Sequence, residues 1–234
     1  MLFIYLVVGV PAALVGIPWS ALRRDFSTMY SWGMGIMALG VRAAGIRVRL
    51  EGVENIAPGT QYIFLSNHLS NLDPPVLLPS IPGRTSVFLK RELMKIPLLG
   101  MAMRMGRFVP VSRGNSREEA QQSVAVAADA LHGGLHITVF PEGTRSQDGR
   151  LLPFKKGAFF LAEETGAPII PVILSGTREM MPRGTLRIEP GVAQVRFLAP
   201  IRPQDARSRE ELVERVRAAM EAELERRPAT PQST

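Results

Sequence analysis

Short apolar runs rich in β-branched residues alternate with amphipathic stretches from Ile46 onward. This alternation predicts an α/β fold, with a mostly parallel central sheet of about seven strands flanked by helices. The runs that predict strands are Ile46–Leu50, Tyr62–Ser66, Ser86–Leu89, Phe108–Val111, Ile137–Phe140, Ile169–Leu174 and Ala193–Phe197.

Helical periodicity appears in the segments between these runs. In the last segment the apolar residues fall on one face, which indicates a helix that packs on the core. The predicted helices are Pro74–Pro79, Glu92–Met105, Arg117–His132, Gly157–Thr165 and Arg209–Arg226.

The N-terminal region has a different pattern. Residues 1–20 are mostly apolar and carry no charge, and a second apolar stretch runs from Phe26 to Val41. About 20 such residues can span a bilayer. Glycines and prolines interrupt the first stretch, so a helix that only enters the membrane is the alternative. We predict a membrane-associated apolar helical hairpin.

The flanking charges orient this hairpin. Arg23 and Arg24 follow the first apolar stretch and predict that the rest of the chain lies on the cytoplasmic face of the cell membrane. No basic residue precedes the stretch, which argues against a cleaved signal peptide. The expected organisation is a hairpin in residues 1–45, an α/β domain in 46–227 and a disordered tail in 228–234.

Composition narrows the functional classes. The chain has 234 residues and no cysteine, which excludes disulfides, a thiolate nucleophile and cysteine-ligated metals. The net charge of +7 favours an anionic partner, such as a phosphate-bearing substrate, an acidic carrier or a lipid surface. Aromatic residues make up 6% of the chain and fall in apolar runs, which argues against nucleic-acid binding.

The turn after the second predicted strand holds a candidate catalytic base. His68 can take a proton from an alcohol near neutral pH. Asp73, five positions later, can fix the imidazole tautomer if the loop folds back. Asp73 before Pro74 also fits a helix N-cap, so a structural role for the aspartate is the alternative.

A second polar turn, Phe140–Arg145, follows the predicted strand at Ile137–Phe140. Ligands of α/β sheets gather where loops leave the carboxyl ends of strands. Arg145 suits a phosphate, and Glu142 can hold the guanidinium or accept from a substrate hydroxyl. A solvated Glu–Arg pair is the alternative. Arg113 and Lys155 occupy comparable positions, either as further phosphate ligands or as ordinary surface charge.

Taken in order, these motifs resemble the glycerolipid acyltransferase family of the 1-acyl-glycerol-3-phosphate acyltransferase type. His68 to Asp73 matches the family's His-x4-Asp motif, and Phe140–Arg145 matches its Phe-Pro-Glu-Gly-Thr-Arg block. One departure is Ser112 before Arg113, where many members have aspartate. Further matches are Lys90, Glu92, Pro97, Gly100, Arg113, Phe154–Lys155, Gly157 and Pro168–Val172.

The resemblance implies transfer of an acyl group from a thioester to a lysophospholipid, giving phosphatidic acid, with His68 as base oriented by Asp73. It implies no cofactor and no metal. The partners would be a membrane lipid and the thioester of acyl carrier protein or coenzyme A. The substrate-binding residues it implies are Lys90, Arg113, Glu142, Gly143, Thr144, Arg145 and Lys155.

Four apolar residues in the predicted helix Glu92–Met105 recur at helical spacing: Met94, Leu98, Met101 and Met105. Methionine adapts to a flexible chain, so we expect these residues to line an acyl-chain groove. An ordinary core stripe is the alternative.

Other functions fit less well. His132 and His136 are four apart, but Gly133 and Gly134 interrupt the helix that a zinc site would need. A serine hydrolase could use Ser70, yet the chain has no Gly-x-Ser-x-Gly elbow. A non-enzymatic lipid-binding module would not need His68 and Asp73. Glycerol 3-phosphate or another lysolipid stays open as the acceptor.

Overall fold

A seven-stranded sheet organises the computed structural model, which describes residues 1–111, 117–185 and 187–226. The strand order is β1-β7-β6-β2-β5-β3-β4, and β6 with β7 is the antiparallel pair. The predicted sheet is confirmed. Its strands are β1 (Ile46–Glu51), β2 (Ile63–Ser66), β3 (Thr85–Lys90), β4 (Val109–Val111), β5 (His136–Val139), β6 (Ile169–Ser175) and β7 (Gly191–Phe197).

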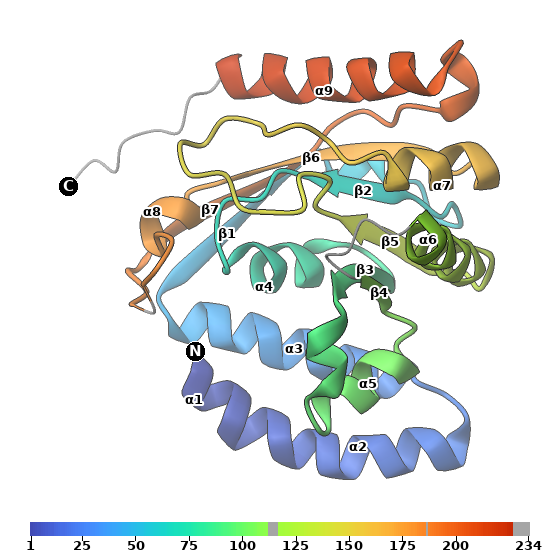
Figure 1. The fold of residues 1–234 in the computed structure, drawn as a ribbon. Helices are drawn as coiled ribbons and strands as arrows, with labels where there is room; N and C mark the ends of the chain where they lie inside the picture. The colour runs from blue at the N-terminus through green and yellow to red at the C-terminus, as the bar shows by residue number, and fades with distance from the viewer. Residues whose placement is uncertain (112–116, 186, 227–234) are drawn as a thin grey trace.

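Both faces of the sheet are covered, because alternate residues of β2 enter different cores. Ile63 and Leu65 belong to one apolar cluster, and Tyr62 and Phe64 to the other. Figure 1 shows α7 and α9 above the sheet, with α4 and α3 below it. The first cluster is closed by α6 (Arg117–His132), α7 (Gly157–Thr165) and α9 (Arg209–Arg226), and the second by α3 (Ser27–Ala43), α4 (Asp73–Leu77) and α8 (Thr177–Met180).

The predicted bounds of α6, α7 and α9 are confirmed, but the single helix predicted over Glu92–Met105 is wrong. This segment forms a 3-10 helix, η4 (Arg91–Lys95), followed by α5 (Leu99–Met105). Leu98 between them has φ 59° and ψ −55°, and the Leu99 N–H donates to the Pro97 carbonyl at 2.6 Å. This tight turn breaks the helix, so Met94 does not share a helical face with Met101 and Met105.

The N-terminal hairpin is present. A helix runs through α1 (Leu2–Ile4), the π-helical segment η1 (Tyr5–Gly9) and α2 (Val10–Arg23), and then turns back into α3. Glycines bring the two arms together. The Tyr5 ring lies over Gly40, and the backbone at Gly16 packs against Met29 and Trp32.

The two arms of the hairpin have different surroundings. α3 lies between α2 and the α/β domain (Figure 1), and its Tyr30 hydroxyl accepts a hydrogen bond from the Thr85 N–H at 3.0 Å. Among the described residues, one helix, Tyr5–Arg23, is long and apolar enough to cross a membrane. The first arm exposes Phe3, Leu6, Val7, Val8, Val10, Leu14, Val15, Trp19 and Leu22.

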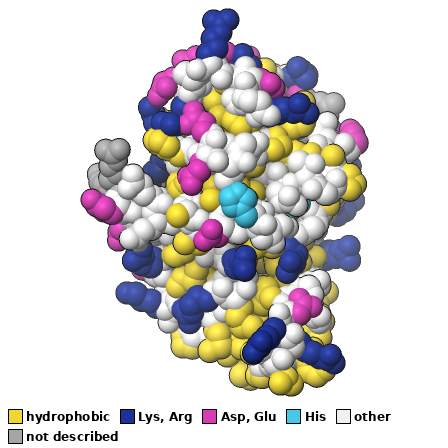
Figure 2. All heavy atoms as spheres, turned by 90° about the vertical axis from the view of Figure 1, so that its right-hand side faces the viewer, with side chains coloured by type: hydrophobic (Ala, Val, Ile, Leu, Met, Phe, Trp, Pro, Cys, Tyr) yellow, Lys and Arg dark blue, Asp and Glu magenta, His cyan; other side chains and the backbone are white. Residues whose placement is uncertain are grey.

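The molecular surface is also divided into an apolar region and a charged region. Figure 2 shows hydrophobic side chains gathered at the lower end of the molecule, with a band of lysine and arginine side chains above them. Such a border of cations beside apolar surface suits the headgroup region of a bilayer. The tail predicted over residues 228–234 lies outside the described residues.

Candidate active site

Three parallel strands at the centre of the sheet end at the same edge. β2 pairs with β5 on one side and with β6 on the other. The loops that follow these strands therefore meet, and they carry His68, Glu142 and Thr177. This is the edge where α/β sheets place their ligands.

The structure brings His68 and Asp73 together. The Nδ1 atom of His68 lies 2.7 Å from Oδ2 of Asp73. Because an ionised carboxylate can only accept, Nδ1 carries the proton and Nε2 keeps its lone pair. The His68 side chain is 19% exposed, so this nitrogen is within reach of a substrate at the surface. The pair is arranged as a general base with its orienting carboxylate.

Asp73 is fully buried, and its carboxylate accepts more than the histidine bond. Oδ2 also accepts from the N–H groups of Leu69 at 2.6 Å and Ser70 at 2.8 Å. The predicted N-cap role is wrong: Asp73 is the first helical residue, after Leu72 as N-cap, and its carboxylate turns back to the preceding loop. The loop folds around the buried charge, since an unpaired carboxylate there would be costly.

Thr177 is the partner that sequence reasoning missed. Its hydroxyl donates to Oδ1 of Asp73 at 2.6 Å, and both side chains are fully buried. Thr177 begins α8, a helix of four residues with no recognisable start pattern. The one available signal was its place just after β6, at the active edge of the sheet.

Among the described residues Glu142 holds no arginine, which corrects the predicted pairing with Arg145. Its Oε1 accepts from the backbone N–H of His68 at 2.9 Å, and its Oε2 accepts from that of Leu152 at 3.0 Å. Burial raises the pKa of this carboxyl, although both hydrogen bonds oppose the shift. The Ser146 N–H donates to the His68 carbonyl at 2.8 Å, so this loop binds the His68 backbone on both sides.

Other contacts hold the His68 ring in place and keep the Ser70 hydroxyl from acting as a nucleophile. The Phe140 ring stacks on the His68 ring, with 4.3 Å between centroids. The Asn67 side chain exchanges two hydrogen bonds with the backbone of Leu174 in β6. The buried Ser70 hydroxyl donates to the Met181 carbonyl at 2.8 Å, so its proton is directed away from His68. This geometry does not suit a serine nucleophile.

Basic side chains lie around the same turn. Arg145 is half-buried and makes no hydrogen bond or ion pair with the described residues. The Lys155 amine lies beside Gly143, whose φ of +68° suits glycine, and a Cβ there would come within 2.9 Å of Nζ. Thr144 is exposed, as is Lys90 at the end of β3. Arg113 lies outside the described residues.

The broken helix changes the argument for an acyl-chain groove. Met101 is exposed on α5, while Leu98 and Met105 are half-buried. Met94 lies on η4 and lines a separate cavity. The groove stays a prediction, now without the shared helical face from which it was argued.

The two histidines considered for zinc have separate settings. His136 is buried in β5, and its Nδ1 accepts from the Tyr62 N–H at 3.1 Å. His132 is exposed at the end of α6. Within residues 1–111, 117–185 and 187–226, no group of three or more His, Cys, Asp or Glu side chains could hold a metal ion.

Comparison with known proteins supports the sequence resemblance. Residues 47–175 match the family model described as Acyltransferase. The chain is 33% identical over 189 residues to a 1-acyl-sn-glycerol-3-phosphate acyltransferase from Limnanthes douglasii, covering 81% of the chain and 66% of that relative. It is also 33% identical to the alpha enzyme of that name from Bos taurus, covering 89% of the chain and 73% of the relative.

A solved structure shares the fold. The crystal structure titled 1-acyl-sn-glycerophosphate (LPA) acyltransferase, PlsC, from Thermotoga maritima superposes with a TM-score of 0.78 at 29% identity. The match covers 98% of this chain and 96% of that one. The likeness thus includes the N-terminal hairpin, whereas the chain spans about two thirds of the length of the plant relative.

Replacing the Glu142 carboxylate tests its structural role. In Glu142→Gln the amide nitrogen faces one of the two backbone N–H groups, leaving it unsatisfied, so we expect a loss of about 1–3 kcal/mol in stability. Denaturant unfolding of the detergent-solubilised protein measures this loss. Glu210→Gln, which removes an exposed carboxylate paired with Lys156, is the control and should leave the unfolding midpoint nearly unchanged. Equal midpoints for the two variants would contradict the assignment.

Proposed function

Because the chain belongs to the acyltransferase family, we propose that it transfers a fatty acyl group from an acyl thioester to the free hydroxyl of 1-acyl-glycerol 3-phosphate, giving phosphatidic acid. The observation that carries the proposal is the His68–Asp73 pair at 2.7 Å, at the edge where β2, β5 and β6 end. The names of the matched relatives support the choice of acceptor.

The proposed reaction needs one base and no acyl-enzyme. His68 Nε2 takes the proton of the acceptor hydroxyl while the alkoxide oxygen forms a bond to the thioester carbonyl carbon. The tetrahedral intermediate collapses, the carbon–sulfur bond breaks, and the thiolate leaves with the proton that His68 had taken. Asp73 stabilises the imidazolium in between. The step balances with the two substrates alone, since the acceptor proton ends on the leaving thiol and no oxidant, reductant or further group is consumed.

Acceptor recognition is assigned to the cations beside the histidine. A dianionic phosphate needs more than one cation to offset its desolvation. Arg145 is free of partners among the described residues, and Lys155 lies over the Gly143 turn. They form the proposed phosphate site, and Arg113, which the family resemblance also assigns to substrate binding, stays a prediction. Glu142, whose oxygens are both occupied by backbone N–H groups, acts on the site by holding the His68 loop.

The proposed setting is the cytoplasmic face of the cell membrane. The exposed apolar side chains of α2 contact lipid, and Arg23 and Arg24 at its end favour the cytoplasmic side. The partners are membrane lipid and the thioester of acyl carrier protein or coenzyme A. The basic surface suits an acidic carrier.

Removing the base tests the mechanism. His68→Gln keeps a polar side chain but cannot cycle a proton near neutral pH, so kcat should fall by about 10²- to 10⁴-fold. The assay follows a labelled acyl thioester with lysophosphatidic acid and with glycerol 3-phosphate in parallel. The unfolding midpoint and vesicle pelleting should stay close to those of the unmodified protein.

Two outcomes would change the conclusion. Unchanged turnover in His68→Gln would refute the base. Transfer to glycerol 3-phosphate in preference to lysophosphatidic acid would keep the mechanism and replace the acceptor.

The phosphate site predicts a selective kinetic effect. Arg145→Lys keeps the charge but loses the planar fork, so the KM for the acceptor should rise about tenfold while the KM for the donor stays nearly constant. Arg150→Lys is the matched control, because Arg150 is exposed in the same loop. Equal rises in both KM values would contradict the assignment, because Arg145 would then not bind the acceptor selectively.

A further inference from the structure

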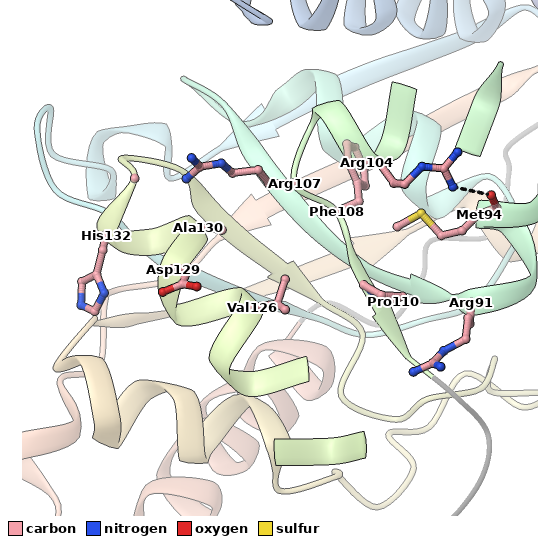
Figure 3. A pocket seen from close by; sticks show the side chains of 11 residues that line it. Arg91, Met94, Arg104, Arg107, Phe108, Pro110, Val126, Asp129, Ala130 and His132 are labelled. Atoms are coloured by element: carbon pink, nitrogen blue, oxygen red, sulfur yellow. Dashed lines mark hydrogen bonds between the residues drawn. The ribbon is translucent and has the colours of Figure 1, made fainter. Parts of the chain in front are cut away.

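A cavity of about 970 Å³ lies at the β4 edge of the sheet, between η4, α5 and α6. Figure 3 shows Arg91, Arg104 and Arg107 on different sides of it, with their guanidinium groups pointing apart, and Met94, Phe108 and Val126 among its apolar walls. Of the described residues that line this cavity, none contacts His68, Asp73 or Glu142. Three strand spacings separate β4 from β2, which is about 14 Å.

The cavity has an excess of positive charge. Among the described residues that line it, Asp129 is the one carboxylate, against three guanidinium groups. Arg104 donates to the Met94 carbonyl at 3.0 Å, which holds one wall in place. Arg91 lies 3.8 Å from Glu119, and such an exposed pair neutralises little of its charge. These groups suit an anion that also has an apolar part.

The α5 side of the cavity contacts the N-terminal hairpin. α5 contacts α2, and the Phe26 ring lies 3.0 Å from where a Cβ would stand at Gly106, directly after α5. Four apolar side chains in the segment from η4 to α5 are exposed. They are Leu93 at 37%, Ile96 at 45%, Leu99 at 42% and Met101 at 45%.

We propose that this cavity binds an anionic phospholipid of the bilayer, with the headgroup in the space lined by Arg91, Arg104 and Arg107 and the acyl chains along the exposed apolar residues Leu93, Ile96, Leu99 and Met101. An acidic carrier protein would pair with the arginines, but it would leave the exposed apolar side chains beside the hairpin uncovered. The bound lipid anchors the β4 edge at the membrane. The proposal uses the membrane setting of the proposed function and does not depend on its chemistry.

Binding to the full-length protein in neutral detergent tests this site. The probes are dioctanoyl phosphatidylglycerol, dioctanoyl phosphatidylcholine and inorganic phosphate, and native mass spectrometry counts the ligands retained. We expect phosphatidylglycerol to be retained selectively. The combined Arg91→Gln, Arg104→Gln and Arg107→Gln variant should weaken this binding on the order of 100-fold. Val126→Trp fills the cavity without changing charge and should also reduce binding.

The matched control removes the same charge from the opposite side. Arg202→Gln, Arg207→Gln and Arg215→Gln together change exposed arginines in or near α9, which Figure 1 shows on the far side of the sheet from the hairpin. This control should bind phosphatidylglycerol normally. Equal losses in both triple variants, or equal retention of all three probes, would overturn the proposal. So would a raised acceptor KM in the cavity variant, since the cavity would then belong to the catalytic site.

An independent observation concerns Thr177. Gly176 precedes it with φ +83°, and a Cβ there would collide with the Val192 carbonyl, so the turn that places Thr177 is fixed by β7. Its hydroxyl occupies Oδ1 of Asp73 and leaves Oδ2 to the histidine. We infer that Thr177 is a positioning residue that sets the plane of the Asp73 carboxylate. This inference rests on the proposed function.

Thr177→Val and Thr177→Ser separate positioning from packing. Valine keeps the shape and loses the donor, so kcat should fall about tenfold with both KM values unchanged. The carboxylate, with one donor fewer, interacts more strongly with the imidazolium, so the acid limb of the pH–rate profile moves to higher pH. Serine should restore both properties.

A direct titration of the His68 imidazole by NMR needs no turnover, so it distinguishes this inference from a failure of the proposed reaction. A valine variant with the original kcat, pH profile and imidazole titration, but a lower unfolding midpoint, would show that Thr177 is only structural. A serine variant that fails to restore these properties would also refute the inference.

Discussion

The buried carboxylate of Asp73 is the constraint on which the active edge depends. It is fully shielded from water and accepts from His68, Leu69, Ser70 and Thr177. A charge at this depth is tolerated only when its oxygens are satisfied, so the loop after β2 must close around it and α8 must supply its hydroxyl. The histidine is oriented as a consequence of that closure. Glu142 repeats the arrangement from the other side, since it is also buried and also binds backbone N–H groups. The two carboxylates together connect the ends of β2, β5 and β6. Both are buried, whereas the nearby side chains of Arg145 and Lys155 are more exposed.

Much of the fold followed from local pattern. Strands buried on both faces appear as short apolar runs, and long helices such as α6 and α9 have enough turns to show their periodicity. The failures are equally physical. Residues 92–105 look helical by composition, but Pro97 and the turn at Leu98 stop the helix. α8 is too short to have a pattern. The apolar stretch of α3 resembled its hairpin partner, yet α3 packs on the α/β domain and buries Met29, Tyr30, Gly40 and Val41. Local composition cannot separate a helix that faces lipid from one that faces a core.

At the active site, the sequence predicted the residues involved more accurately than the contacts that these residues make. His68 and Asp73 are close in the chain, so a five-residue loop could be assessed directly. Glu142 was assigned to Arg145 because the two are neighbours in sequence, whereas its partner His68 is 74 residues away. Thr177 is 104 residues from Asp73. Contacts between loops of different strands depend on strand order, and β6 beside β2 could not be deduced from periodicity.

The position of α3 has a consequence for lipid traffic. With α2 at the bilayer surface in the proposed setting, α3 holds the α/β domain roughly one helix diameter, about 10 Å, farther from the lipid. In the proposed reaction the acceptor is therefore lifted partly out of its leaflet to reach His68, and each methylene exposed costs about 0.8 kcal/mol. A lysolipid lifts one chain. The diacyl product would have to keep two chains out of the bilayer, so the free energy that favours its return is roughly twice as large. The geometry of the hairpin therefore favours departure of the product from the site over its retention.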